Sequence, residues 1–390
     1  MATRSLGALI VPLGFGQTGG RMIYAHVVGS MLRPKELIGA RDALRQGRLT
    51  PSAFKAIEDA AVDRCIAVQE RCGIGLITDG EQRRFLFTDS FGSSVAGIEL
   101  ATNEDPTEQL WHDHEGKAVK SPRATVMPTI VGKLSRRNSL GTEEYAYARA
   151  RARRPLKVTL PSPTCALIYW SQKHSTAAYP HALAALDDVA AILREEIAQL
   201  AALGCEHVQI DAPELTMAID PASMRMFEGF GFTRASFLAE ALALLGGLAK
   251  DAPVEMSIHM CRGNNQGLWH TAGGYDAISK ECFPHLSGYR YVLLEYDDER
   301  SGSFAALADL PRDCAAVLGL VSTKHARLEP LDLLMQRIDA ASRHFPRAQL
   351  AVSPQCGFAS AIFGNPISLE IEEQKLRRVG EVAARLGATK

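Results

Sequence analysis

The stretch SIHMCRGNN, residues 257–265, closes an apolar run and places His259 and Cys261 two positions apart. Residues two apart on a β-strand share a face, so both side chains would point the same way at the end of a strand. Histidine and cysteine are both metal ligands. Such a pair alone is more often two ordinary buried residues than half of a metal site, so the rest of the chain has to decide.

The run VEMSIHM (254–260) is one of eight short runs rich in apolar or β-branched residues, most of them bounded by Gly, Pro or Asp. This pattern is typical of buried strands. The other seven runs are MIYAHVVG (22–29), GIGLITDG (73–80), LKVTLP (156–161), HVQID (207–211), YVLLEY (291–296), AAVLGLVS (315–322) and AQLAVSP (348–354).

Longer segments with a helical period lie between these runs. They are residues 51–73, 186–205, 232–248, 331–345 and 368–387. The first begins with Thr50 as N-cap and Pro51 in the first turn, and it ends at Gly73. The alternation predicts an α/β fold, a (β/α)8 TIM barrel, with an open doubly wound sheet as the alternative.

Residues 85–155 do not fit the alternation. They are polar, contain no clean strand–helix unit and end in the basic run RARARRP (149–155). A charge run of this kind is typical of a solvated face. We interpret 85–155 as an insertion after the second strand, partly a hairpin or arm, within a single barrel domain that covers residues 1–390.

Composition excludes several classes of protein. The 390 residues are 46% hydrophobic and 22% charged with a net charge of −1, so a basic face for nucleic acid is not expected. No apolar run approaches the roughly 18–20 residues that span a membrane, and glycines break the N-terminal apolar patch. We expect a cytoplasmic protein whose eight scattered cysteines are mostly free thiols.

A barrel collects its active site at the carboxyl ends of its strands. His259 and Cys261 end the fifth run, Glu295 ends the sixth and Cys356 follows the eighth. Zinc takes nitrogen, sulfur and oxygen donors of this kind, usually four of them, and two thiolates favour zinc over magnesium or calcium. The other polar residues at run ends are Ser30, Asp79, Glu81, Asp211 and Lys324.

Three other motifs carry less weight. GFGQTG (14–19) matches a dinucleotide-binding pattern, but a strand-like segment follows it where a helix should begin. HDHEG (112–116) lies in the polar insertion without cysteines, and we interpret it as an exposed loop. No phosphate-binding P-loop pattern is present.

Seven stretches of the sequence carry a family resemblance when they are taken together. They are HVVGSMLRP (26–34), TDGEQRR (78–84), QIDAPEL (209–215), HMCRGN (259–264), LLEYDDERSG (293–302), LGLVSTK (318–324) and LAVSPQCGF (350–358). They resemble the catalytic half of cobalamin-independent methionine synthase, most closely its short single-barrel members. The resemblance implies a (β/α)8 barrel of the uroporphyrinogen decarboxylase type. It also implies a transferase that moves a methyl group to a homocysteine-like thiol.

The resemblance assigns roles to individual residues. It implies that His259, Cys261, Glu295 and Cys356 hold Zn²⁺. It implies that Glu81 and Asp211 meet the substrate's amino group and that Ser30 meets its carboxylate.

The chain also departs from the long synthases. It lacks their N-terminal half, carries a longer segment after Cys261, and has Lys324 where they have a histidine linked to proton delivery. The donor is therefore open: a methyltetrahydrofolate, or an epoxide, corrinoid-bound or aryl methyl group. Asn264, Asn265 and Trp269 could line its pocket.

We predict that Lys324, His26 or a water protonates the leaving group. Two other readings remain: a lyase or decarboxylase on the same barrel, which would survive Cys356→Ala, and a barrel with a structural zinc only. The expected partners are a small-molecule thiol and a methyl or alkyl donor. A homodimer is compatible with the sequence, which does not fix the oligomeric state.

Overall fold

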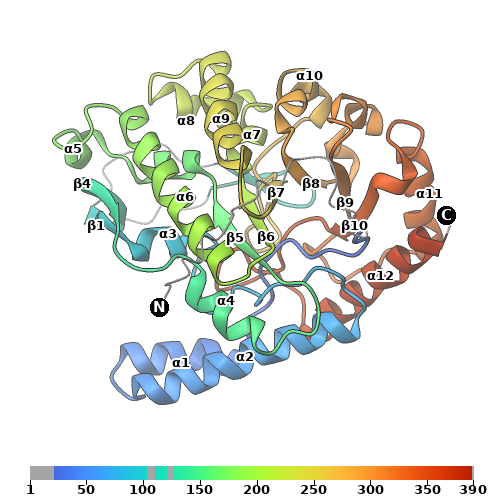
Figure 1. The fold of residues 1–390 in the computed structure, drawn as a ribbon, viewed down its shortest axis with the longest axis horizontal. Coiled ribbons are helices and arrows are strands. Elements are labelled where there is room, and N and C mark those ends of the chain that lie inside the picture. The colour runs from blue at the N-terminus through green and yellow to red at the C-terminus, as the bar shows by residue number, and fades with distance from the viewer. Residues whose placement is uncertain (1–21, 103–109, 121–125, 389–390) are drawn as a thin grey trace, which may run out of the picture.

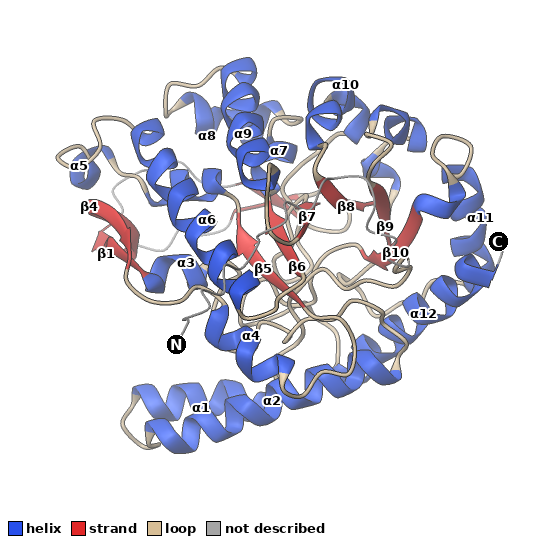
Figure 2. Ribbon diagram, in the orientation of Figure 1, coloured by secondary structure: helices blue, strands red, loops and turns tan. Residues whose placement is uncertain are grey.

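A parallel sheet of six strands forms the centre of the protein (Figures 1 and 2). The computed structural model describes residues 22–102, 110–120 and 126–388, so the GFGQTG motif lies outside the described residues. Each strand pairs with the next one along the chain. The strands are β5 (Lys157–Pro161), β6 (His207–Asp211), β7 (Glu255–Met260), β8 (Tyr289–Glu295), β9 (Ala315–Val321) and β10 (Leu350–Pro354).

These six strands confirm six of the eight predicted runs. Nearly all of their residues are buried, as expected for parallel strands covered on both faces. The first two predicted runs do not form strands. They make isolated parallel bridges, which pair Ala25 with Val352, His26 with Leu76, and Ile77 with Leu156.

Helices surround the sheet (Figure 2). Helix α2 (Pro51–Arg71) begins as predicted, with the Thr50 side chain accepting a hydrogen bond from the Ala53 amide. Gly73 follows the helix in the left-handed region with φ 79°. The other predicted helices are α6 (Leu186–Ala202), α9 (Arg234–Ala249), α11 (Leu331–Ala341) and α12 (Leu369–Ala388).

Several shorter helices are absent from the sequence expectations. Helix α1 (Lys35–Arg45) packs against α2, and α12 contacts α2 from the other end of the chain (Figure 1). The remaining short α-helices are α5 (Gln172–Ser175), α7 (Pro213–Met217), α8 (Pro221–Glu228) and α10 (Ser279–Cys282). The 3-10 helices are η1 (Pro163–Tyr169), η2 (Ala182–Ala185), η3 (Tyr275–Ala277), η4 (Phe283–Leu286), η5 (Glu299–Ser301), η6 (Phe304–Asp309) and η7 (Arg347–Gln349).

Residues 85–155 contain two small antiparallel sheets. Strand β1 (Val95–Thr102) pairs with β4 (Val126–Arg136), and β2 (Leu110–His112) pairs with β3 (Ala118–Lys120). The flanking helices are α3 (Asp89–Ser94) and α4 (Thr142–Arg149). The arginines of the 149–155 run are exposed, as predicted. Among the described helices, none is long and apolar enough to cross a membrane.

Candidate metal and substrate site

Four potential metal ligands meet at the carboxyl end of the sheet. His259 belongs to β7 and Cys261 follows it, Glu295 ends β8, and Cys356 lies just after β10. Their ligand atoms all lie within 4.8 Å of one another. Carboxyl ends of parallel strands share one edge, which is why residues almost 100 positions apart converge here.

The polar atoms of this group fit a metal ion. Both ring nitrogens of His259 are buried and have no hydrogen-bond partner among the described residues. The Sγ atoms of Cys261 and Cys356 are 3.5 Å apart. The hydrogen bond from Cys261, with the nearby charges of His259 and Lys324, holds the pKa of Cys356 well below that of an ordinary thiol. A buried imidazole, a thiolate-prone sulfur, a second sulfur and a carboxylate are donors that zinc accepts.

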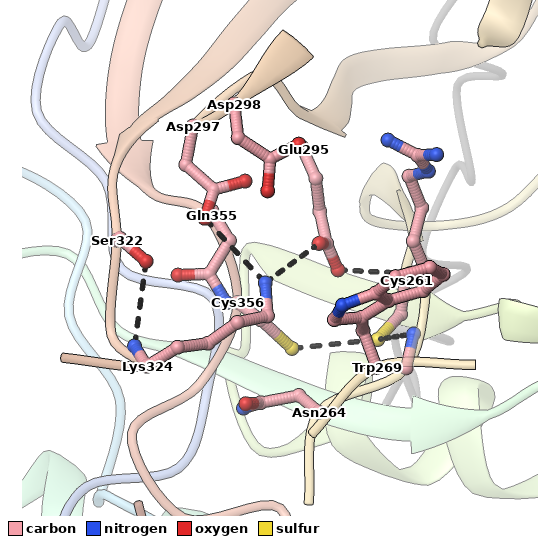
Figure 3. Close-up of polar contacts among 12 residues, drawn as sticks. Cys261, Asn264, Trp269, Glu295, Asp297, Asp298, Ser322, Lys324, Gln355 and Cys356 are labelled. Carbon is pink, nitrogen blue, oxygen red and sulfur yellow. Dashed lines mark hydrogen bonds and ion pairs between the residues drawn. The ribbon is translucent and has the colours of Figure 1, made fainter. Parts of the chain in front are cut away.

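Glu295 is held from two sides. Its Oε1 accepts a hydrogen bond from the Arg262 amide at 2.8 Å. The Nζ of Lys324 lies 3.5 Å from Glu295 Oε2 and 3.5 Å from Asp297 Oδ2 (Figure 3). Burial alone would lower the pKa of Lys324, but the carboxylates of Asp297 and Glu295 outweigh it and raise that pKa. Lys324 is therefore a cation that fixes the orientation of Glu295.

A cavity of about 620 Å³ opens beside the metal-ligand group. Three of the ligands, His259, Cys261 and Cys356, line it. The three residues that the sequence predicted to bind substrate, Ser30, Glu81 and Asp211, also line it. One cavity thus brings together the metal-ligand group and the predicted substrate groups.

Glu81 has an unusual backbone. Its φ is 53°, a left-handed conformation that is rare for a residue with a side chain. Arg33 donates to the Glu81 carbonyl at 2.6 Å, and Asp79 accepts from the Glu81 amide at 2.9 Å. Thr159 donates to Glu81 Oε1 at 2.8 Å, whereas Oε2 is buried without a partner among the described residues. The surrounding contacts hold one carboxylate oxygen and leave the other for a ligand.

Asp211, the last residue of β6, is also buried. Gln209 donates to its Oδ1 at 2.7 Å. Burial raises the pKa of Asp211 to about 7, with a smaller contribution from the Glu81 charge and an opposing one from His259. A cationic ligand group beside Asp211 would favour its ionised form.

Ser30 depends on a glycine beside it. A Cβ atom at Gly357 would lie 2.1 Å from Ser30 Oγ, so only glycine permits the close approach. The Phe358 amide donates to the Ser30 carbonyl at 2.8 Å. The segment after Cys356 therefore positions Ser30 at the cavity.

Neither predicted proton donor lines the cavity. Lys324 is engaged with Glu295 and Asp297. His26 is fully buried, its Nε2 lies 2.9 Å from the Ile23 carbonyl, and its ring packs edge-on against Tyr291 at 4.5 Å. Burial is the largest cause that lowers the pKa of His26 well below its usual value.

The sequence missed one wall of the cavity. Part of it comes from residues 85–155 and part from the segments after β5 and β6. The aromatic and apolar residues of this wall include Phe87, Trp111, His112, Met127, Ile168, Met217 and Met226, and its polar residues are Glu214, Ser223 and Arg225. The adjacent aromatic residues Trp111 and His112, in the otherwise polar segment 85–155, were the sequence signal that could have indicated this wall.

His112 and Trp269 connect the segment 85–155 to the segment after Cys261. Their backbones exchange hydrogen bonds of 2.7 and 3.0 Å, and their rings stack at 4.4 Å. Asn264 and Asn265 line the cavity as predicted, whereas Trp269 lies behind His112 and is not part of the lining. The interpretation of 112–116 as an exposed loop is wrong for His112, which lines the cavity, and correct for residues 114–116, which are exposed.

Comparison with known proteins gives a consistent result. The family model for the cobalamin-independent synthase catalytic domain matches residues 23–368. The uncharacterized protein YxjG of Bacillus subtilis (strain 168) is 31% identical over 92% of this chain and 93% of its own length. A 5-methyltetrahydropteroyltriglutamate–homocysteine methyltransferase of Thermosynechococcus vestitus is 23% identical over 85% of this chain, which spans only 39% of that protein.

The fold has solved counterparts. A Listeria monocytogenes protein, provisionally assigned as a vitamin-B12 independent methionine synthase, superimposes with a TM-score of 0.70. The match covers 94% of this chain and 98% of that one at 24% sequence identity. At this identity the likeness concerns the fold.

Proposed function

The chain belongs to the family of cobalamin-independent synthase catalytic domains, and on that premise we propose that it transfers a methyl group to the sulfur of a homocysteine-like thiol with the help of zinc. Family membership makes it a methyltransferase. The observation that carries the finer proposal is the shared cavity, in which potential zinc ligands and two buried carboxylates face the same space.

His259, Cys261, Glu295 and Cys356 would hold the zinc ion. When bound, zinc keeps a substrate thiol deprotonated and so makes it a nucleophile at neutral pH. Lys324 holds Glu295 in place and neutralises part of the negative charge of the ligand group. Such contacts around the ligands orient them and tune their affinity for metal.

Three residues would recognise an amino-acid thiol. The unpartnered Oε2 of Glu81 and the Asp211 carboxylate would bind its ammonium group, and Ser30 would bind its carboxylate. Charge-assisted hydrogen bonds in a buried site fix orientation strongly. The substrate sulfur would then lie on the side of the cavity lined by Cys261 and Cys356.

The methyl donor would bind against the aromatic and apolar wall. Trp111 and Met127 of the insertion supply part of this wall. A methyltetrahydrofolate, the donor that the family resemblance implies, presents a flat ring suited to such a surface. Besides the metal-ligand candidate His259, the histidines that line the cavity are His112 and His270. Burial lowers the pKa of His270 to about 4, which leaves it without a proton to give at neutral pH, so we assign proton delivery to His112 in place of Lys324 and His26.

We further propose that the sheet closes into an eight-stranded barrel in a single domain, with residues 85–155 as an insertion over the cavity. The bridges from Ala25 to Val352 and from Ile77 to Leu156 support closure, because they connect the segments 22–29 and 73–80 to the two edge strands, β10 and β5. A closed ring places all the site residues on one rim.

The test is an assay for loss of free thiol with zinc-loaded protein. Homocysteine and other thiols would be paired with 5-methyltetrahydrofolate and with other methyl donors. We expect methionine to form with homocysteine, and activity to disappear on chelation of zinc and in Cys356→Ala. Activity that survives both treatments would contradict the proposal and favour a lyase or decarboxylase.

A further inference from the structure

A buried lysine lies beneath the cavity. Lys157, the first residue of β5, is 2% exposed. Its Nζ donates to the Val27 carbonyl at 2.6 Å and to Gln209 Oε1 at 2.5 Å. Both acceptors are neutral, although a buried ammonium is costly without a charged partner. The position of this lysine therefore needs an explanation beyond packing.

Gln209, in the neighbouring strand β6, connects Lys157 to Asp211 by hydrogen bonds. Its Nε2 donates to the Val28 carbonyl at 2.9 Å and to Asp211 Oδ1 at 2.7 Å. The Val28 carbonyl only accepts, so the Gln209 amide must turn its NH2 group toward Val28 and Asp211 and its oxygen toward Lys157. Burial lowers the pKa of Lys157 to about 7, and the orientation holds in either state because a neutral amine also donates.

The chain of hydrogen bonds therefore has one direction and ends at Asp211. Among the described residues, Gln209 is the one that donates to the Asp211 carboxylate. Asp211 lines the cavity, so the oxygen that Gln209 does not hold is the one available to a ligand. Lys157 itself makes no hydrogen bond to Asp211 or Glu81 among the described residues, and Gln209 stands between.

We propose that Lys157 is a positioning residue for substrate recognition. Through Gln209 it holds the Asp211 carboxylate in the orientation that receives the substrate's ammonium group. The role rests on the proposed function, because it presupposes an amino-acid thiol. It adds to the recognition of that thiol a residue that lies two hydrogen bonds from Asp211.

The experiment compares two thiols that differ only in the amino group. Dissociation constants of L-homocysteine and of 4-mercaptobutanoate, which lacks the amino group, are measured by isothermal titration calorimetry on zinc-loaded protein. We expect the wild type to prefer homocysteine by at least about tenfold. Lys157→Met should lose most of that preference, while its zinc content and its affinity for 4-mercaptobutanoate stay unchanged.

Two further variants make the result specific. Gln209→Met removes the residue that connects Lys157 to Asp211 by hydrogen bonds, and it should lose the same preference for homocysteine. The double variant Lys157→Met/Gln209→Met should lose no more of that preference than either single variant. Lys35→Met, at an exposed position of α1, is the control and should keep the preference. If Lys157→Met does not fold, Gln209→Met decides alone.

The outcomes separate the two claims. A wild type that binds both thiols equally contradicts the substrate assignment and removes the basis of this inference. A wild type that prefers homocysteine, with the preference intact in a folded, zinc-loaded Lys157→Met or Gln209→Met protein, overturns the positioning role alone.

Discussion

The Sγ atoms of Cys261 and Cys356 lie 3.5 Å apart although 95 residues separate them in the chain. A disulfide would bring them to about 2 Å, so the two sulfurs are neighbours without being bonded. Both thiols line the same cavity as the candidate substrate groups. We take this pair as the centre of the zinc site.

Removing either thiol should release the metal. Cys261→Ser and Cys356→Ser should each purify with little or no zinc, because a hydroxyl is a poor zinc ligand compared with a thiolate. Cys314→Ser is the matched control, since Cys314 is buried and its Sγ donates to the Pro311 carbonyl of its own turn at 3.0 Å. Elemental analysis of the purified proteins checks this, and full zinc occupancy in Cys356→Ser would refute the assignment.

The Lys324 contact should tune zinc affinity. Lys324→Met removes the cation that holds Glu295 Oε2, and we expect zinc to bind roughly 10–100-fold more weakly, as for other contacts around metal ligands. Lys324→Arg, which keeps the charge, should lose less. Competition with a chromophoric chelator measures both, and wild-type affinity in Lys324→Met would show that Glu295 needs no such support.

Trp111 should matter for the donor and not for the thiol. In Trp111→Ala, 5-methyltetrahydrofolate should bind roughly tenfold more weakly because an aromatic surface of the cavity wall is lost. The affinity for homocysteine should stay the same. Leu100→Ala, at an exposed position of the same segment 85–155, is the control. Calorimetric titration with each ligand decides, and an unchanged folate affinity would exclude Trp111 from the donor site.

A buried carboxyl far from the metal ligands predicts a pH effect on stability. Glu372 in α12 accepts a hydrogen bond from the Leu32 amide at 2.7 Å, and burial raises the pKa of Glu372 to about 8. In the unfolded chain this carboxyl loses its proton near pH 4.5. Between those values the folded state binds the extra proton, so stability falls as pH rises from about 4.5 to about 8.

Glu372→Gln should remove this dependence. The amide oxygen still accepts from Leu32, and no charge has to be buried at high pH. The melting temperature of the variant relative to wild type should therefore be higher at pH 8.5 than at pH 5, since each unit of pKa shift corresponds to about 1.4 kcal/mol. Glu36→Gln, at an exposed position of α1, should show no such trend. A parallel shift of both proteins at the two pH values would contradict the protonated state.

The sequence predicted the metal-ligand group because strand ends are visible in it. Strands β7, β8 and β10 are buried, so they appear in the sequence as largely apolar runs with recognisable ends. His259, Glu295 and Cys356 lie at or just after those ends. Glu81 and Asp211 also stand at run ends, but their substrate roles came from the family resemblance. The left-handed backbone of Glu81 could not be predicted, because the contact from Arg33 to the Glu81 carbonyl is a tertiary one that the local sequence does not show.

Two features exceeded what the sequence could show. Trp111 and His112 reach the cavity because the backbone of His112 pairs with that of Trp269, and such a long-range contact leaves no periodic signal. His26 precedes the cavity residue Val28 by two positions and so shares its face. The position of His26 along the sheet, beside Tyr291 and away from the cavity, depends on the register of the strands, which the sequence does not show.

Cobalt substitution tests the central claim most directly, because Co²⁺ in a zinc site reports each sulfur ligand by its absorption. The cobalt-loaded protein is titrated with L-homocysteine and followed in the near-ultraviolet and visible range. The account predicts that a new sulfur-to-cobalt charge-transfer band grows to saturation with one thiol per metal ion. A spectrum that does not change as homocysteine is added would mean that the metal has no position for the substrate sulfur, and it would contradict the account.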